Sequence, residues 1–127
     1  MPTRSSNTAA VTYLDRGAVL RDLAAAAKQL TARDPNVMAV VLFGSLAHGT
    51  PTPSSDADLL LVVGEDRRRM IDRIPDYTRP FEAARMAIQV LPWTAQELER
   101  RLAAGDRFAK EILETGHVLA GTVPGPT

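Results

Sequence analysis

Residues 40–63 read VVLFGSLAHGTPTPSSDADLLLVV, and this stretch decides which fold the chain can adopt. The continuous apolar run up to Phe43 is typical of a strand buried on both faces, and it ends at a Gly44-Ser45 turn. Further along, Asp56-Ala57-Asp58 opens a second apolar run. Because side chains alternate along a strand, Asp56 and Asp58 project from the same face, with Cα atoms about 6.6 Å apart at a rise of ~3.3 Å per residue. The stretch therefore predicts two strands that place a tight turn and two carboxylates at one site.

These residue types suit a metal-bound triphosphate. Carboxylate oxygens are ligands of Mg²⁺ (or Mn²⁺), and Mg²⁺ keeps open positions for substrate phosphates. Gly44 lets the backbone turn closely, and Ser45 opens a short helix whose free N–H groups, with the serine hydroxyl, can receive phosphate oxygens. We therefore expect Asp56 and Asp58 to be catalytic metal ligands, and Gly44 and Ser45 to bind the nucleotide. The alternative is that Gly44-Ser45 only starts a loop and that both aspartates lie in a solvated loop end.

The rest of the chain mixes helices with strands. Apolar residues at the spacing of one helical face predict a helix over 15–33. Thr94, with Glu97 three residues later, predicts a capping box at the start of another helix, which Gly105 ends. The other expected elements are strands over 37–43, 59–63 and 84–91, helices over 66–73 and 106–115, and a loop over 75–80. This pattern predicts an α/β (α+β) fold, with a small mixed sheet of three to four strands packed against helices.

Length and composition predict one ordinary globular domain. The 127 residues are 45% hydrophobic and 24% charged, and 15 basic residues balance 15 acidic ones, so no net charge directs the chain to nucleic acid or to a membrane surface. The polar or Gly/Pro-rich ends predict flexible tails over 1–12 and 121–127, around a domain over 13–120. Cysteine is absent, which excludes disulfides and thiolate metal sites, and no apolar run has membrane-spanning length. We expect a cytoplasmic protein with no membrane partner.

The turn and the aspartate pair resemble the signature of the nucleotidyltransferase superfamily, which includes DNA polymerase beta, kanamycin nucleotidyltransferase and the minimal nucleotidyltransferases of bacteria and archaea. That signature is glycine-serine, a spacer, then aspartate-any-aspartate, found here at 44–45 and 56–58. The carboxyl end, PWTAQELERRL (92–102) and DRFAKEILETGHVLAG (106–121), is also similar to that of small stand-alone members. The resemblance implies a polymerase beta palm-like fold. It also implies that the aspartates hold two Mg²⁺ ions, that the serine turn holds the β and γ phosphates, and that a nucleoside monophosphate passes to a hydroxyl.

The chain departs from this family at the third carboxylate, which members usually carry on the next strand. Alignment on Thr94 places Gln89 there, and no Asp or Glu occurs between positions 83 and 96. Glu82 lies at an odd spacing from Gln89 and therefore points to the opposite face of an extended strand. Arg85, on the face of Gln89, is either a phosphate contact or a solvated or ion-paired side chain. Because Gln89 offers only a neutral carbonyl oxygen, we expect nucleotide binding to survive and transfer to be slowed or lost.

Several other side chains are given structural or solvent-exposed roles. Trp93 and Phe108 are expected to be core aromatics, and His117 is expected to be structural because no second histidine lies at metal-ligand spacing. The run Arg67–Arg69, with Arg73, is interpreted as a solvated helix face or, alternatively, as a surface for a phosphate-rich acceptor.

Two functions from different classes follow from these observations. The first is a metal-dependent nucleotidyltransferase that binds an NTP and transfers NMP to a hydroxyl acceptor, impaired to the extent that Gln89 replaces a carboxylate. The second is a catalytically inactive nucleotide-binding or antitoxin-like module that pairs with a helical partner of the HEPN type. A homodimer or a small helical partner protein is expected to complete the acceptor site, and a nucleic acid acceptor stays open.

Overall fold

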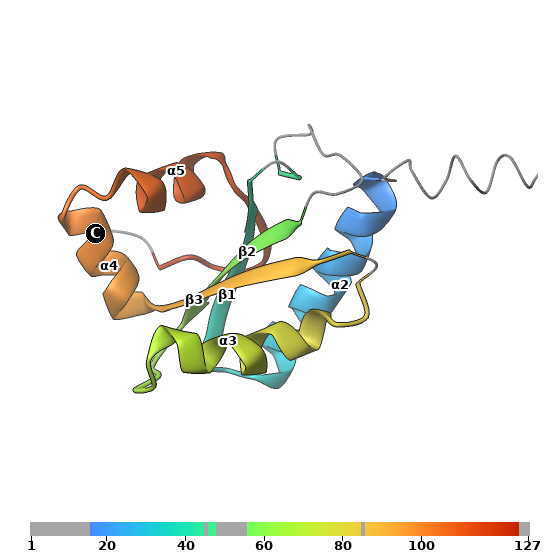
Figure 1. Ribbon diagram of the computed structural model, residues 1–127, viewed down its shortest axis with the longest axis horizontal. Helices are drawn as coiled ribbons and strands as arrows, with labels where there is room; N and C mark the ends of the chain where they lie inside the picture. The colour runs from blue at the N-terminus through green and yellow to red at the C-terminus, as the bar shows by residue number, and fades with distance from the viewer. Residues whose placement is uncertain (1–15, 45, 48–55, 85, 125–127) are drawn as a thin grey trace, which may run out of the picture.

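The computed structural model describes residues 16–44, 46–47, 56–84 and 86–124, which form a four-stranded sheet covered by helices (Figure 1). The expected α/β (α+β) class with a small mixed sheet is confirmed. No helix in the described ranges has both the length and the apolar character needed to cross a bilayer. In chain order the elements are α2 (Arg16–Arg33), β1 (Val37–Phe43), β2 (Ala57–Val63), α3 (Met70–Thr78), the 3-10 helix η1 (Arg79–Phe81), β3 (Ile88–Thr94), α4 (Ala95–Ala103), α5 (Arg107–Thr115) and β4 (His117–Gly121).

The sheet has the strand order β3-β2-β1-β4. β1 runs antiparallel to both β2 and β4, whereas β2 and β3 are parallel, with α3 in the crossover between them. The register pairs Phe43 of β1 with Asp58 of β2, and pairs Asp58 with Gln89 of β3. Residues directly opposite one another share a face of the sheet, so these three side chains lie in one row across it.

Each face of the sheet buries its own hydrophobic cluster. Leu59 and Leu61 of β2 pack with residues of α2 and α3, whereas Leu60 and Val62 pack with residues of α4 and α5. Figure 1 shows α2 on one side of the sheet, with α4 and α5 on the other. Asp58 lies two and four residues before Leu60 and Val62, so its side chain is on the same face of the sheet as theirs. The carboxylate therefore lies on the face that α4 and α5 cover.

The helix ends follow local sequence signals. The capping box of α4 is confirmed, because Thr94 Oγ1 accepts the backbone N–H of Glu97 at 3.1 Å and a carboxylate oxygen of Glu97 accepts the N–H of Thr94 at 2.9 Å. Gly105 follows α4 with a φ of 79°, in the left-handed region that favours glycine. The carboxylate of Asp106 then accepts two backbone N–H groups at the start of α5.

The helix expected over 66–73 is wrong, since α3 spans Met70–Thr78 and includes Pro75. Two interactions explain the shift. Asp66 Oδ1 accepts the backbone N–H of Arg68 at 3.0 Å, a local turn that competes with helix formation. Tyr77, in the stretch expected to be a loop, is buried in the core, and this burial stabilises a helix that propensity alone disfavours.

The third strand is displaced from the expected 84–91 to Ile88–Thr94, past Pro92. Proline lacks the N–H that an interior ladder position requires, but β3 is an edge strand. The carbonyl of Pro92 accepts a hydrogen bond from Arg73 of α3 at 3.0 Å, so this residue presents its backbone to the helix rather than to β2. Proline is therefore tolerated at this position.

Arg73 and the carboxyl end also differ from expectation. Arg73 is 3% exposed and is hydrogen-bonded to Glu97. Its buried guanidinium therefore joins α3 to α4 and is not part of a solvated face. β4 includes Gly121, and the N–H of Thr122 donates to the carbonyl of Met38 at 3.0 Å. The sheet thus continues past position 120, where the domain was expected to end. Residues 1–12 and 125–127 of the expected tails lie outside the described residues.

Candidate functional site

Asp56 directly precedes β2 and Asp58 is its second residue, on either side of the fully buried Ala57. Both aspartates are half-buried, and they are close enough for their charges to interact. Burial raises the pKa of Asp58 above its ordinary value, and the neighbouring Asp56 carboxylate raises it further. Two carboxylates held together against their repulsion form a site that a cation stabilises.

Gly44 is in contact with this carboxylate pair. Its φ of 80° is in the left-handed region, and a Cβ at this position would lie under 3.0 Å from Oδ2 of Asp58. Only glycine satisfies both conditions, because it has no Cβ. The turn after β1 therefore brings the backbone directly against the Asp58 carboxylate. Ser45, the other expected nucleotide-binding residue, lies outside the described residues.

Gln89 reaches the same pair from the other side. It lies opposite Asp58 in the parallel register, and its amide nitrogen donates a hydrogen bond of 2.8 Å to Oδ2 of Asp56. The sequence placed Gln89 where the family has its third carboxylate, and the structure brings this residue to the aspartates. An amide N–H, however, occupies one acceptor position of Asp56 that a cation would otherwise use. Arg85, the other side chain considered for this strand, lies outside the described residues.

The two carboxylates suit a divalent cation that is also coordinated by a bound ligand. Within the described ranges, no group of three or more His, Cys, Asp or Glu side chains is placed to hold a metal ion. Mg²⁺ is commonly held by one or two carboxylates together with substrate phosphates, and hard cations prefer oxygen ligands. Asp56 and Asp58 therefore suit Mg²⁺ or Mn²⁺ that arrives with a triphosphate better than a permanently held structural metal.

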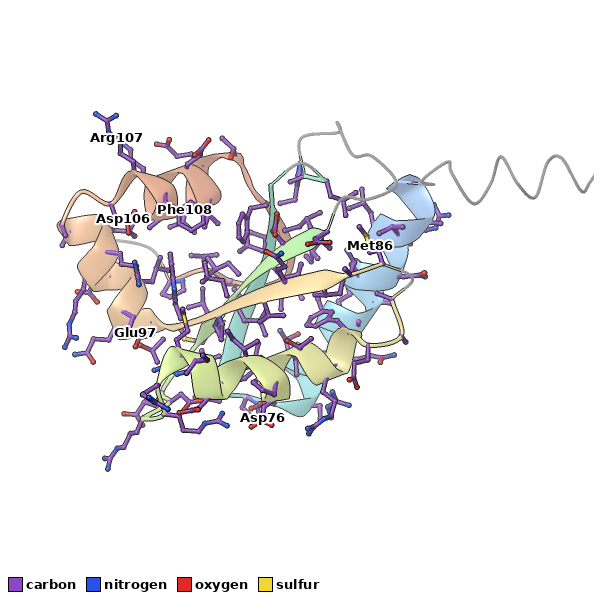
Figure 2. All side chains as sticks on the ribbon, viewed as in Figure 1. Asp76, Met86, Glu97, Asp106, Arg107 and Phe108 are labelled. Carbon is purple, nitrogen blue, oxygen red and sulfur yellow. The ribbon has the colours of Figure 1, made fainter. Side chains whose placement is uncertain are left out.

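A pocket of about 240 Å³ opens beside Asp58, between the end of β1 and one face of α5. Phe108, expected to be a core aromatic, is instead 48% exposed and lines this pocket, whereas Trp93 is buried as expected. Figure 2 shows Phe108 on the inner side of α5, with Arg107 pointing away from the sheet. The α5 residues that line the pocket follow one helical face and were missed, although their spacing is a visible signal. They are Phe108, Glu111, Ile112 and Thr115.

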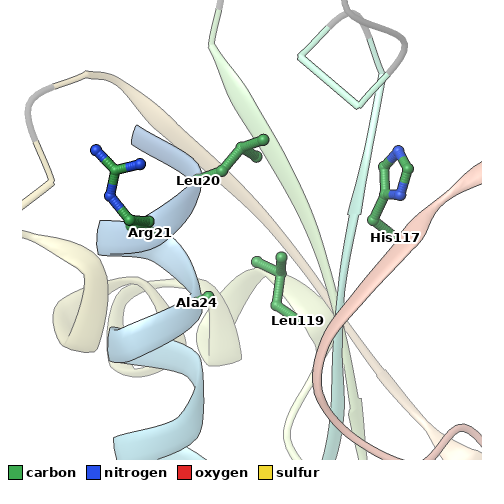
Figure 3. Close-up of a pocket in the computed structure, with 5 residues that line it drawn as sticks. All are labelled: Leu20, Arg21, Ala24, His117 and Leu119. Atoms are coloured by element: carbon green, nitrogen blue, oxygen red, sulfur yellow. The ribbon is translucent and has the colours of Figure 1, made fainter. Parts of the chain in front are cut away.

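A larger pocket, about 390 Å³, lies between α2 and β4 (Figure 3). Its lining is largely aliphatic, from Leu20, Ala24 and Leu119, and it contains no carboxylate. His117 at its edge donates from Nε2 to the carbonyl of Ala47 at 2.8 Å, the structural type of role expected for it. This pocket lacks the chemistry of the Asp56/Asp58 site.

Comparison with known proteins agrees with this fold. The family described as Polymerase beta, Nucleotidyltransferase matches residues 26–122. The crystal structure of a candidate nucleotidyltransferase from Sulfolobus solfataricus superposes with a TM-score of 0.54 at 22% sequence identity, over 67% of this chain and 75% of that chain, so the two share a fold. A structure of a toxin-antitoxin with AMP-PNP has a TM-score of 0.47 at 16% identity, over 86% of this chain and 75% of that chain, which is too distant to support an inference. No curated protein matches the sequence.

The matched range extends from α2 through β4 and includes the Gly44 turn, both aspartates and Gln89. It covers well over half of the 127 residues, and the fold and the signature residues agree with it. The resemblance found in the sequence is confirmed, and the chain belongs to the polymerase beta nucleotidyltransferase family.

Proposed function

We propose that this protein binds a nucleoside triphosphate with Mg²⁺ or Mn²⁺ at Asp56 and Asp58 and transfers a nucleoside monophosphate to a hydroxyl acceptor. The observation that carries this proposal is the contact between the Gly44 backbone and the Asp58 carboxylate, with Asp56 alongside. The turn that would bind phosphate and the two carboxylates that would bind the cation then lie next to each other at one end of β2. Family membership supplies the class of reaction.

In this reaction the acceptor oxygen forms a bond to the α phosphorus, and the bond from that phosphorus to the leaving pyrophosphate breaks. Asp56 and Asp58 would hold the cation, which when bound neutralises phosphate charge as it develops. The hydroxyl proton must pass to a base. Gln89 is a neutral amide and cannot accept it, so the described site lacks the base that a carboxylate at this position would provide.

Calorimetric titration of ATP, GTP, CTP and UTP with Mg²⁺ or Mn²⁺ tests the binding step. The wild type is expected to bind saturably and only with the metal. Asp56→Asn/Asp58→Asn is expected to lose binding, since amides cannot supply the two negative charges. Asp22→Asn/Asp72→Asn removes the same charge from exposed positions on α2 and α3 and should bind like wild type. A folded wild type that binds no nucleotide would refute the proposal for the isolated chain.

Gln89→Asp tests whether the missing carboxylate limits transfer. The variant restores a base and a metal ligand opposite Asp58, and the wild-type hydrogen bond to Asp56 is removed. General bases typically contribute 10²–10⁴-fold, so we expect pyrophosphate release to rise by about 100-fold when an acceptor is present. Gln96→Asp, the same change at an exposed position of α4, should have no effect. If Gln89→Asp binds the nucleotide yet reacts no faster than Gln96→Asp, then Gln89 does not limit the reaction.

The hydrogen bond from Gln89 to Asp56 favours a second candidate, an inactive nucleotide-binding or antitoxin-like module that acts with a small helical partner protein. In this alternative, nucleotide binding stabilises a conformation that the partner recognises, and no pyrophosphate is released. Saturable binding without turnover, together with co-purification of a helical partner, would favour the module. Pyrophosphate release that depends on Asp58 would favour the enzyme.

A further inference from the structure

The pocket beside Asp58 lies on the side of the carboxylate pair away from Gln89. In the row across the sheet, Asp58 is flanked by Gln89 on β3 and by Phe43 on β1, and the pocket includes Phe43 and Gly44. Gly44 belongs to the turn that is proposed to hold phosphates. A group placed in this pocket is therefore next to the bound triphosphate, while the acceptor side at Gln89 stays open.

We propose that this pocket receives the base of the bound NTP and favours bases that carry an amino group over uracil. The inference rests on the proposed function, because it requires that an NTP binds at Asp56 and Asp58. It adds to that function a base-binding surface on α5, formed mainly by Phe108 and Glu111, and a preference among nucleotides.

The size of the pocket suits a base rather than an entire nucleotide. Pockets that hold complete small molecules are typically about 300–1,000 Å³. The volume here is about 240 Å³, which is smaller than that range. Phosphates are disfavoured inside the pocket itself, because the Glu111 carboxylate, which is not one of the proposed metal ligands, presents negative charge there.

The aromatic part of the pocket is held in place before any ligand binds. The Phe108 ring makes edge-to-face contacts with Phe43, at 5.8 Å between centroids, and with Trp93, at 6.2 Å. Trp93 is buried, and the guanidinium of Arg101 lies 4.3 Å from the centre of its ring. Two neighbours thus orient the Phe108 ring while about half of the residue remains accessible. Stacking of a base on such a ring needs little further ordering of the protein.

The polar side chains that line the pocket are all hydrogen-bond acceptors. Besides Asp58, which is proposed to hold the cation, the pocket has the carboxylate of Glu111, which only accepts hydrogen bonds when ionised. The hydroxyl of Thr115 donates its single hydrogen to the backbone carbonyl of Glu111 at 2.8 Å, so its oxygen is left as an acceptor. Adenine, cytosine and guanine offer exocyclic amino groups to such acceptors. Uracil offers one N–H between two carbonyl oxygens, and these oxygens are repelled by the carboxylate.

The experiment compares ATP, GTP, CTP and UTP, each with Mg²⁺, and Mg²⁺-tripolyphosphate as a probe without a base. In wild type, UTP is expected to bind about tenfold more weakly than the amino-bearing nucleotides. Phe108→Leu is expected to weaken all four nucleotides about tenfold, because base–aromatic stacking is lost, and to leave tripolyphosphate unchanged. Leucine keeps an apolar side chain at this half-exposed position, so the fold should be retained.

Glu111→Gln tests the preference itself. Glutamine has both a donor and an acceptor, so the difference between UTP and ATP is expected to shrink at least about threefold. Glu114→Gln removes the same charge from an exposed position of α5 that does not line the pocket, and it should preserve the difference. The control separates base recognition from the general gain in anion affinity that the loss of a negative charge produces.

The outcomes distinguish this inference from the function on which it rests. Equal binding of all four nucleotides, lost in Asp56→Asn/Asp58→Asn but unchanged in Phe108→Leu and Glu111→Gln, overturns the base pocket and leaves the triphosphate site intact. Absence of binding by both nucleotides and tripolyphosphate overturns both proposals. A preference for amino-bearing bases that Glu111→Gln reduces and Glu114→Gln preserves supports the pocket as the base site.

Discussion

Replacing Arg73 with methionine is expected to lower the free energy of unfolding by about 3 kcal/mol, the lower end of the cost of removing one partner of a buried ion pair, because Arg73 is buried whereas the side chain of Glu97 is 37% exposed. Guanidinium has five N–H donors, and all of them are used here. Nη1 and Nη2 donate to the two carboxylate oxygens of Glu97 at 2.7 and 3.0 Å. The remaining donors reach the carbonyls of Arg68, Pro92 and Asp66 at 2.9 to 3.0 Å.

The expected loss is large because methionine fills the volume but satisfies none of these acceptors. The Glu97 carboxylate also accepts the N–H of Thr94 in the capping box, so the substitution loosens the start of α4 as well. The Arg73 guanidinium holds the pKa of Glu97 below its ordinary value, which shows that the charged form is the one stabilised in the fold. Arg73 therefore connects α3, the end of β3 and α4 through one side chain.

Urea denaturation followed by circular dichroism measures this loss, and Arg69→Met provides the control. The side chain of Arg69 is 81% exposed and pairs with Asp72 three residues later, at 3.1 Å, so its removal should cost less than about 1 kcal/mol. Arg73→Lys should fall between the two variants, because an ammonium has three donors and cannot pair with both carboxylate oxygens in the same planar arrangement. If Arg73→Met is as stable as Arg69→Met, the buried network contributes little to folding.

Replacing Gly44 with alanine is expected to weaken binding of Mg²⁺-nucleotide by at least about 100-fold while the chain still folds. Positive φ costs a residue with a Cβ roughly 1–2 kcal/mol, which a stable domain tolerates. The new methyl group, however, would overlap Oδ2 of Asp58, so either the carboxylate or the turn must move. Catalytic and binding groups need placement within about 0.5 Å, and the displacement would separate the proposed metal ligand from the turn proposed to bind phosphate.

Gly105→Ala is the matched control for this prediction. Gly105 has a φ of 79°, almost the same as Gly44, but no atom lies within 4 Å of the Cβ that alanine would add. It should therefore show the backbone cost without any change in nucleotide affinity. Calorimetric titration and a crystal structure of Gly44→Ala measure binding and the position of Asp58 separately. Nucleotide affinity within threefold of wild type, with Asp58 unmoved, would contradict the proposed role of Gly44.

The sequence alone predicted those features that a few neighbouring residues determine. The capping box at Thr94 and Glu97 depends on residues three apart, and it forms as expected. The shared face expected for Asp56 and Asp58 follows from the two-residue period of a strand. The family signature consists of such local features, which is why it was recognisable before the structure was known.

The tertiary structure decided what depends on residues far apart in the chain. Arg73 is buried because its partners Pro92 and Glu97 come from other elements, and the burial of Tyr77 stabilises α3 beyond its expected end. Phe108 is half-exposed because α5 packs beside Phe43 and leaves a pocket, and Gln89 meets Asp56 only through the parallel pairing of β2 and β3. Side-chain periodicity and helix capping depend on the conformational preferences of a single segment. Burial, register and pocket shape are set by the packing of several segments, and they overrule local preference wherever the two disagree.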